Sequence, residues 1–513
     1  MRADKGQMTA TVGRWALVVA LIFTMGALTA CDRLLSVNLP TAVTSGAFDN
    51  PGTADIQVNS VMALVECGYS GLALDASGNE DNFERYSGSA GSYEEYNDTP
   101  VGGECDPDNP YSHQWVDAML TARAEGYNTY DRIGNWTDAE VSDREKLLAE
   151  DALYTAVALD VFGEYFCDFA IDAGPMMTPD MTLDTAAVWV DRALSHIGNT
   201  GDFAIDVQNG EVTPSIEQMA HGLKARILWA KGDLSGAAAE AAQVEDGFYS
   251  YILRETGAKR RNMVSVMQGG GGGTQAGGFL QGAVKLKTAD NDYGVSLLGN
   301  KPNGEPWPDV VPFTGYLNLA IGPDGRAVDA DGYPITTDAA GSVADVRVPY
   351  TIGNTAGGPD NIIQKYVSES DDIPLVSWVE MRLIQAEAEG GAAAVGYVNQ
   401  VRHGSVYIGG SLQQIDLPDV TYNPTGDQVE DMIVEERRRA LWLEGRYWAT
   451  KIQHPNKLWF PRKIGDWVNQ AASYVLNGGV RVLMPEDEYQ INPNLTLADR
   501  ATACPADQAP VYQ

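Results

Sequence analysis

Basic side chains are scarce in this sequence. Its 513 residues include 35 Lys and Arg against 70 Asp and Glu, which gives a formal net charge of −35. A nucleic-acid partner is therefore not expected, because such binders need a basic face that displaces counterions. The same charge disfavours a peripheral protein that holds anionic lipids through Lys and Arg.

Histidine is scarce too, and common catalytic motifs are missing. The five His form no HExxH pair, and no Gly-x-Ser-x-Gly turn occurs. Carboxylate pairs carry no information, because 70 acids produce such pairs by chance. We therefore predict no enzyme, no catalytic residue, no metal site and no cofactor. An exported enzyme that degrades glycans or peptides remains the alternative.

Three short patterns resemble ligand loops only in part. The run Gly269–Gly273 lacks the GK[ST] ending of a phosphate-binding loop, and we read it as a flexible connection. Asp106-Pro107-Asp108 and Asp329-Ala330-Asp331-Gly332 lack the other ligands of a calcium loop. Both are predicted to be turns.

Cysteine is the third rare residue, with five in the chain. The first, Cys31, follows a basic N-terminus and the uncharged stretch Trp15–Ala30. This stretch is short for a membrane span and fits the apolar core of a signal peptide. Small residues directly before Cys31 resemble the lipobox of bacterial lipoproteins. We predict that residues 1–30 are a signal peptide and that Cys31 is lipidated; an ordinary secretory signal with a chance Cys is the alternative.

The other four Cys permit two disulfides in an exported protein, with three possible pairings (Cys67, Cys105, Cys167 and Cys504). Proximity in sequence favours Cys67–Cys105, which leaves Cys167–Cys504. Buried free thiols are the other interpretation.

Helical periodicity dominates two stretches of the chain, at about 112–245 and 371–455. Apolar residues recur at helical spacing in five segments (115–136, 143–162, 216–230, 375–390 and 428–452). Gly163 is expected to end the second of these helices. The turn Lys231-Gly232-Asp233 and the Ala-rich segment 235–244 follow the third, which is typical of a tetratricopeptide-like helix hairpin.

Two other stretches are predicted to be loop-rich. Residues 75–111 and about 246–370 are rich in Gly, Pro, Asp, Asn and Ser, with Tyr and Trp interspersed. Loops of this length are uncommon in compact domains and are usually functional or disordered.

Several segments together resemble the SusD/RagB family of outer-membrane nutrient-binding lipoproteins. They occur in the family's order along the chain (Leu34–Pro40, Glu150–Glu164, Asp345–Arg347, Leu375–Glu389, Asn399–Arg402, Glu435–Trp448, Met484–Pro485 and Asn492–Leu495). The sharpest is EERRRALWLEGRYW at Glu435–Trp448. Its charges are expected to pair within the fold: Glu435 with Arg439 at i,i+4, and Arg446 with a carboxylate of a neighbouring helix.

The resemblance implies a mainly α fold. Tetratricopeptide-like helix pairs would form a body, and a loop-rich irregular half would carry little β structure. In these terms residues 31–513 form a single domain, with the helical body mainly at 112–245 and 371–455 and the loop-rich part mainly at 75–111 and 246–370.

The resemblance also implies a function. Members bind oligosaccharides or other nutrients without breaking bonds and serve a SusC-like TonB-dependent β-barrel transporter. We therefore expect a lipid-anchored protein of the outer membrane that faces the cell exterior, although Asp32 after the lipidated Cys leaves the choice of membrane open. A helical-repeat scaffold without a small ligand is a further alternative.

In such proteins aromatic side chains on loops stack on sugar rings, and a few polar groups bind the hydroxyls. Applied to this chain, the resemblance implies a ligand site on 75–111 and 300–320. The expected residues are five rings and two polar partners (Tyr86, Tyr93, Tyr96, Trp307 and Tyr316, with Asn82 and Arg85). Rings that merely pin the loops to the body are the alternative. The acidic charge disfavours polyanionic ligands.

Overall fold

The computed structural model describes most of the chain after residue 47. The described residues are 48–79, 83–85, 115–207, 210–256, 260–267, 274–276, 285–287, 320–321, 327–328, 342–355, 358–420, 427–454, 468–469, 474–475, 481–484, 486–500 and 503. The chain divides into two units, Met1–Thr53 and Ala54–Gln513. In the first, the 3-10 helix Pro51–Thr53 is described. No helix among the described residues is long and apolar enough to cross a membrane.

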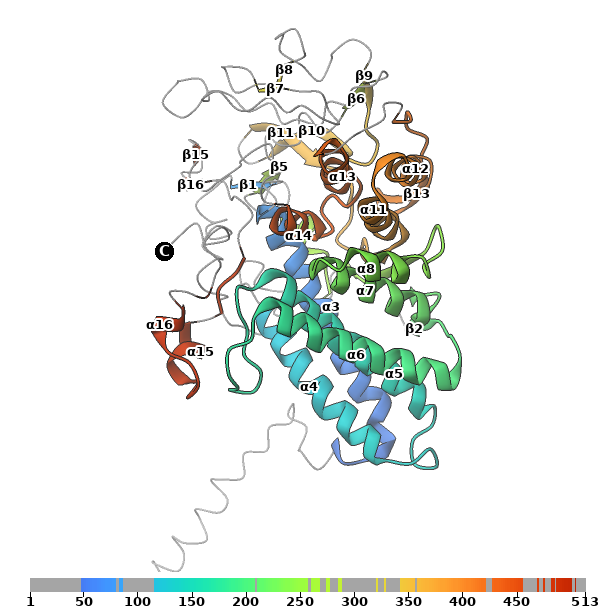
Figure 1. Cartoon of the computed structure of the whole chain (residues 1–513), viewed down its shortest axis with the longest axis vertical. Helices are drawn as coiled ribbons and strands as arrows, with labels where there is room; N and C mark the ends of the chain where they lie inside the picture. The colour runs from blue at the N-terminus through green and yellow to red at the C-terminus, as the bar shows by residue number, and fades with distance from the viewer. Residues whose placement is uncertain are drawn as a thin grey trace, which may run out of the picture. The chain divides into compact units, whose positions relative to one another are not determined.

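The described part of the second unit is mainly helical (Figure 1). Its helices are α3 (Ala54–Asn79), α4 (Trp115–Asn135), α5 (Arg144–Tyr165), α6 (Pro179–Thr200), α7 (Ile216–Ala230), α8 (Leu234–Ala241), α9 (Met263–Met267), α11 (Trp378–Glu389), α12 (Gly391–Arg402), α13 (Asp427–Ala440), α14 (Arg446–Gln453), α15 (Glu486–Ile491) and α16 (Leu497–Arg500). The predicted mainly α class is confirmed.

Strands are short and pair antiparallel in twos. The pairs are β1 (Phe83–Arg85) with β5 (Thr274–Ala276), β2 (Ile205–Val207) with β3 (Gly210–Thr213), β4 (Tyr249–Ile252) with β12 (Ile373–Ser377), β6 (Lys285–Lys287) with β9 (Ser342–Ala344), β7 (Ala320–Ile321) with β8 (Ala327–Val328), β10 (Tyr350–Thr355) with β11 (Gly358–Ile363), β13 (Ser405–Ile408) with β14 (Ser411–Gln414), and β15 (Val468–Asn469) with β16 (Tyr474–Val475).

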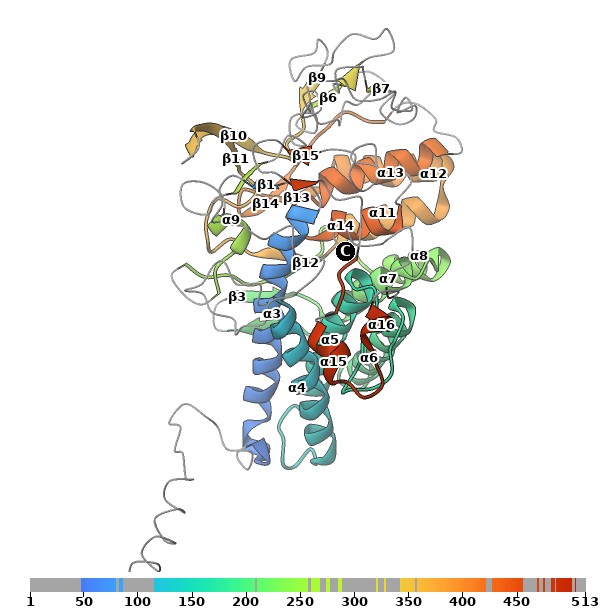
Figure 2. The same cartoon turned by 90° about the vertical axis from the view of Figure 1, so that its left-hand side faces the viewer.

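Successive helices pack as pairs, as the family resemblance implies. Among the described residues α3 packs on α4, α5 on α6, α7 on α8 and α11 on α12. Contacts of α8 with α11, and of α11 with α13, continue the stack (Figures 1 and 2). One continuous hydrophobic core runs through these pairs, from Val61 in α3 through Leu159 in α5 to Trp448 in α14.

Local signals fix many helix ends. The Ser215 hydroxyl caps α7 by accepting from the Gln218 backbone N–H at 3.1 Å, and Asp233 caps α8 through Gly236 at 3.0 Å. Gly390, at φ 65°, ends α11 in a conformation that favours Gly. The predicted helix 216–230 and its hairpin partner are therefore both present.

Three predicted boundaries were wrong. The predicted helix 428–452 is two helices, because Leu443 at φ 61° and Gly445 at φ 77° turn the backbone left-handed between α13 and α14. Gly163 does not end α5. It allows close packing instead, since an added Cβ would lie 2.6 Å from the Leu183 side chain. Residues 375–377 are strand, because β12 pairs with β4 there.

The loop predicted at 75–111 also begins too early. Helix α3 runs to Asn79, and Phe83–Arg85 form β1. The apolar side chains of α3 that face α4 are buried up to Ala76, so tertiary packing extends the helix through Gly- and Ser-containing sequence.

The C-terminal segment 481–500 packs across the connection between α5 and α6. The Arg481 guanidinium donates to the backbone carbonyls of Gly163 and Glu164 at 2.9 and 2.7 Å. Tyr489 donates its hydroxyl proton to the Asp168 carboxylate at 2.6 Å. The end of the described chain thus completes the first half of the helical body.

Candidate binding site

Most residues of the predicted ligand site lie outside the described residues. Asn82, Tyr86, Tyr93, Tyr96, Trp307 and Tyr316 all do, and so does the predicted lipidation residue Cys31. Arg85 is described as the last residue of β1, paired with Thr274 of β5. The seven ligand-binding residues therefore stay predictions.

Both of the remaining Cys that the structure describes take part in disulfides. Cys67 on α3 and Cys167 after α5 are each disulfide-bonded. Cys105 and Cys504 lie outside the described residues. The pairing Cys67–Cys105 and Cys167–Cys504 stays a prediction.

The described strands bound two longer segments, 86–114 and 288–341, which contain most of the predicted site region 75–111 and all of 300–320. Segment 86–114 leaves β1, whose partner is β5, and β5 contacts β11. Segment 288–341 begins after β6 and returns in β9, and these two strands pair. Strand β9 leads through a short turn into the hairpin β10–β11. Both segments are thus rooted on strands that adjoin one hairpin.

That hairpin is held at both ends by buried polar contacts with α13 and the turn after it. Before β10, Arg347 lies 2.5 Å from Glu436 of α13. After β11, the Lys365 ammonium lies 2.6 Å from Glu444, and the Tyr366 hydroxyl donates to the Leu443 carbonyl at 3.1 Å. All of these side chains are buried.

The contacts at Arg347 belong to a larger group, here called the Glu436 cluster (Asp345, Arg347, Arg402, Glu435, Glu436, Arg438 and Arg439). Glu436 accepts from Arg347 at 2.5 Å and from Arg402 at 2.6 Å. Glu435 accepts from Arg439 at 2.8 Å, which confirms the predicted i,i+4 pair. The charges of the conspicuous EERRRA segment thus face the interior of the fold.

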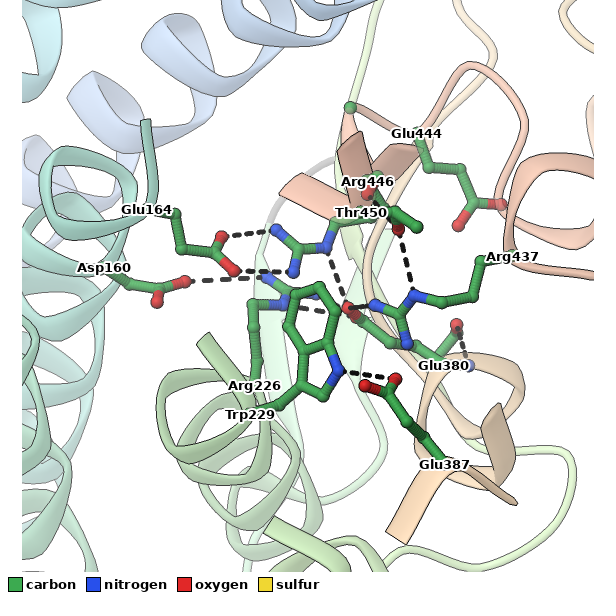
Figure 3. A network of polar contacts seen from close by, with 12 residues as sticks. Asp160, Glu164, Arg226, Trp229, Glu380, Glu387, Arg437, Glu444, Arg446 and Thr450 are labelled. Carbon is green, nitrogen blue, oxygen red and sulfur yellow. Dashed lines mark hydrogen bonds and ion pairs between the residues drawn. The ribbon is translucent and has the colours of Figure 1, made fainter. Parts of the chain in front are cut away.

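A second buried group, here called the Glu380 cluster, joins four helices and the start of α14 (Asp160, Glu164, Arg226, Glu380, Arg437 and Arg446; Figure 3). The Arg446 guanidinium donates to Glu164 of α5 and to Glu380 of α11, at 2.8 Å each. Arg226 of α7 donates to Glu380 at 2.7 Å. The prediction that Arg446 reaches a neighbouring helix is confirmed.

In the Glu380 cluster, the protonation state of a carboxylate depends on whether nearby guanidinium groups offset the cost of burying its charge. Burial disfavours the Glu380 carboxylate, but the guanidinium groups of Arg226 and Arg446 hold its pKa far below the ordinary value. Asp160 is the opposite case: burial and then the charge of Glu164 raise the pKa of Asp160 well above its usual range. Glu380 is thus ionised and cross-links helices, whereas Asp160 favours its neutral form.

The indole of Trp229 borders the Glu380 cluster (Figure 3). It donates to Glu387 at 2.8 Å, and Arg437 lies 4.1 Å above its ring. His454 lies 2.7 Å from Glu430 and 3.1 Å from Glu387. Burial opposes the charged imidazole, but these two carboxylates raise the pKa of His454 to about 9.

Chemically, both clusters are suited to rigid support. Most of their carboxylates are buried and accept from guanidinium groups, as Glu380 does from Arg226 and Glu436 does from Arg347. Asp160 differs, since the nearest Arg226 nitrogen lies 3.9 Å from its carboxylate. Among the described residues, no group of three or more His, Cys, Asp or Glu could hold a metal ion. The geometry therefore supports a structural role for these buried charges.

The sequence analysis missed most partners of these clusters. Glu164, Arg226 and Glu380 lie in three different helices, of which α5 is buried on nearly all sides from Leu148 to Tyr165. The usable signal was a charged residue on the otherwise apolar face of each helix. Their meeting depends on tertiary packing, which no local pattern encodes.

Comparison with known proteins gives a likeness at the level of structure. No family model matches the sequence, and no curated protein matches it. A SusD-like protein from Bacteroides fragilis superimposes with a TM-score of 0.51 at 13% identity, covering 81% of this chain and 88% of that one. A SusD superfamily protein from Parabacteroides distasonis gives 0.51 at 12%, covering 89% and 99%. The chain has the SusD-like fold, as the sequence motifs predicted.

Proposed function

We propose that this protein is a cell-surface lipoprotein that binds a nutrient, most simply a neutral oligosaccharide, and delivers it to a TonB-dependent transporter of the outer membrane. The observation that carries the proposal is the SusD-like fold. In this chain the two segments with the predicted aromatic residues follow strands β1 and β6, which belong to the pairs β1–β5 and β6–β9. A rigid support under loops suits a binding protein, because fixed loops lose little entropy when a ligand binds.

Oligosaccharide is the favoured ligand class for a chemical reason. Tyr and Trp rings stack on the apolar faces of sugar rings, and the predicted site offers Tyr86, Tyr93, Tyr96, Trp307 and Tyr316. The formal net charge of −35 repels polyanions at long range, which favours neutral glycans over sulfated ones.

Binding is tested by calorimetry of the full-length protein against a panel of neutral plant and microbial oligosaccharides. For a sugar that binds, we expect Trp307→Ala to weaken affinity at least about tenfold, as loss of one stacking ring does. Tyr397→Ala is the control, since Tyr397 lies on α12 and bonds Glu389. Equal effects of the two substitutions would refute the site, and shortened products after incubation would favour the enzyme alternative.

Anchoring and delivery are tested together. Tagged protein is purified in mild detergent from its native outer membrane, and its partners are identified by mass spectrometry. We expect a large β-barrel receptor in stoichiometric amount, together with N-terminal acylation at Cys31. Cys31→Ser should release the protein from the membrane fraction. Recovery of the protein alone, or from the inner membrane, would overturn the transporter role.

A further inference from the structure

The segment Asp345–Val348 forms a turn that closes on itself. The Asp345 carboxylate accepts from the Arg347 backbone N–H and Nε at 3.0 Å each, and from Arg347 Nη2 at 2.9 Å. The Val348 N–H donates to the Asp345 carbonyl at 3.1 Å. Asp345 and Arg347 are 2% and 1% exposed, whereas Val346 between them faces solvent. The turn is therefore held by its two buried charges.

This turn is attached to α13 at two points. Arg347 Nη1 donates to Glu436 Oε2 at 2.5 Å, and Arg439 Nη1 donates to Asp345 Oδ2 at 2.9 Å. Burial disfavours ionisation of Asp345, but the neighbouring guanidinium groups of Arg347 and Arg439 hold its pKa below the ordinary value. Ionised, bidentate contacts of this kind fix geometry more tightly than neutral hydrogen bonds.

The place of the turn in the chain gives it a second role. Strand β9 ends at Ala344, directly before the turn, and pairs with β6 at the base of segment 288–341. Strand β10 starts two residues after the turn and pairs with β11. Strand β11 contacts β5, and β5 pairs with β1 at the base of segment 86–114. The turn thus directly follows the strand pair at the base of segment 288–341, and it is linked to the base of segment 86–114 through β10, β11 and β5.

We propose that Asp345 and Arg347 are positioning residues: through Glu436 and Arg439 they hold the strand pair β6–β9 on α13 directly and the pair β1–β5 through the hairpin β10–β11, so that the bases of both predicted binding segments depend on this turn. The proposal rests on the proposed function for its biological meaning. Its structural content is that loss of these contacts loosens both strand pairs together and leaves the α4–α6 helices unchanged.

Hydrogen exchange of the full-length protein without ligand tests this directly, because exchange reports local opening segment by segment. For Arg347→Met, which removes three hydrogen bonds to carboxylates, we expect amides of β1, β5, β6 and β9 to exchange at least about tenfold faster. Amides of α4, α5 and α6 should keep their rates. Arg347→Lys, which keeps the charge but not the fork geometry, should give a smaller change.

The matched control is Arg382→Met. Arg382 is also a buried guanidinium with a carboxylate partner, Asp246 at 2.6 Å, but it contacts the end of α8 and the segment after it. The substitution should speed amide exchange in that region and leave exchange in β1, β5, β6 and β9 unchanged. If Arg347→Met does not fold, Asp345→Asn is the milder variant, since Asn keeps an acceptor for the Arg347 N–H.

The proposal is supported if Arg347→Met speeds exchange in both strand pairs but not in α4–α6, and if Arg382→Met leaves exchange in both strand pairs unchanged. Faster exchange in one pair, in neither, or uniformly throughout the chain overturns it. No sugar takes part in this experiment, so failure to bind oligosaccharides would refute the proposed function without affecting this result.

Discussion

Helices α5 and α13 are both enclosed by the fold, but they are stabilised by opposite chemistry. From Leu148 to Tyr165 nearly every residue of α5 is buried, and most are Ala, Val, Leu or aromatic. From Met432 to Ala440 every residue of α13 is buried, and five in succession are Glu or Arg. Apolar packing tolerates a range of neighbours of suitable volume, whereas buried charges tolerate only neighbours that pair with them. The difference indicates that α5 supplies stability and α13 supplies specific geometry.

The largest effect should come from breaking a charge pair beside α13. Arg446→Met leaves Glu164 and Glu380 short of a buried partner, and we expect a loss of about 3–5 kcal/mol in unfolding free energy, measured by urea denaturation. The control Arg192→Met removes an exposed guanidinium that stacks on Trp189 at 4.3 Å, and should cost about 1 kcal/mol or less. Equal costs would show that the buried pairs add nothing.

On the apolar side, Leu159→Ala in α5 should cost about 2–5 kcal/mol, because the cavity lies in a core position with no exposure. Leu412→Ala, at 44% exposure in β14, should change the free energy by about 0.5 kcal/mol or less. The cost of the Leu159 variant should not depend on pH between 5 and 9, because the substitution removes no titratable group. A cost that changed with pH would mean that packing at Leu159 is coupled to a titrating group.

His454 provides a pH test on the charged side. Its pKa in the fold is about 9 against an ordinary 6.5, so its contribution is complete below pH 6.5 and is lost as the pH rises through 9. We expect His454→Gln to cost about 1–3 kcal/mol at pH 6 and little at pH 10, by urea denaturation at both values. A constant difference across this range would mean that the imidazole is not charged in the fold.

Asp151 is the exception within α5 and should give the smallest effect. Among the described residues, neither carboxylate oxygen of Asp151 has a hydrogen-bond partner. Burial and then Glu150 raise its pKa, so the native state loses stability as the pH rises above the unfolded value of 3.8. Asp151→Asn should therefore be more stable than the parent by about 1 kcal/mol at pH 8, with a smaller gain at pH 5. Melting curves at the two pH values check this, and a gain that grew on acidification would contradict it.

The same comparison explains what the sequence could predict. Apolar periodicity found α5 and α7 nearly complete, because their burial follows a local pattern. The motif at Glu435–Trp448 identified the fold, and the i,i+4 rule found the Glu435–Arg439 pair. Periodicity failed at Leu443 and Gly445, where two left-handed residues divide a continuous helical pattern.

The candidate site could be predicted only in outline. Segment composition indicated loops with aromatic residues, but the register of β1 with β5 and of β6 with β9 depends on pairs about 190 and 57 residues apart along the chain. Asp345–Arg347 was noticed only as a motif. Its role became visible when Glu436 and Arg439, about 90 residues later, were found beside it.

The C-terminal segment has a consequence for the order of folding. Arg481 contacts Gly163 and Glu164 across 318 and 317 residues, and Tyr489 contacts Asp168 across 321. Contacts of such long sequence separation form late, because a large loop must close first. The connection after α5 therefore stays incomplete until residues 481–489 have been synthesised, so the first half of the helical body acquires its last contacts late in folding.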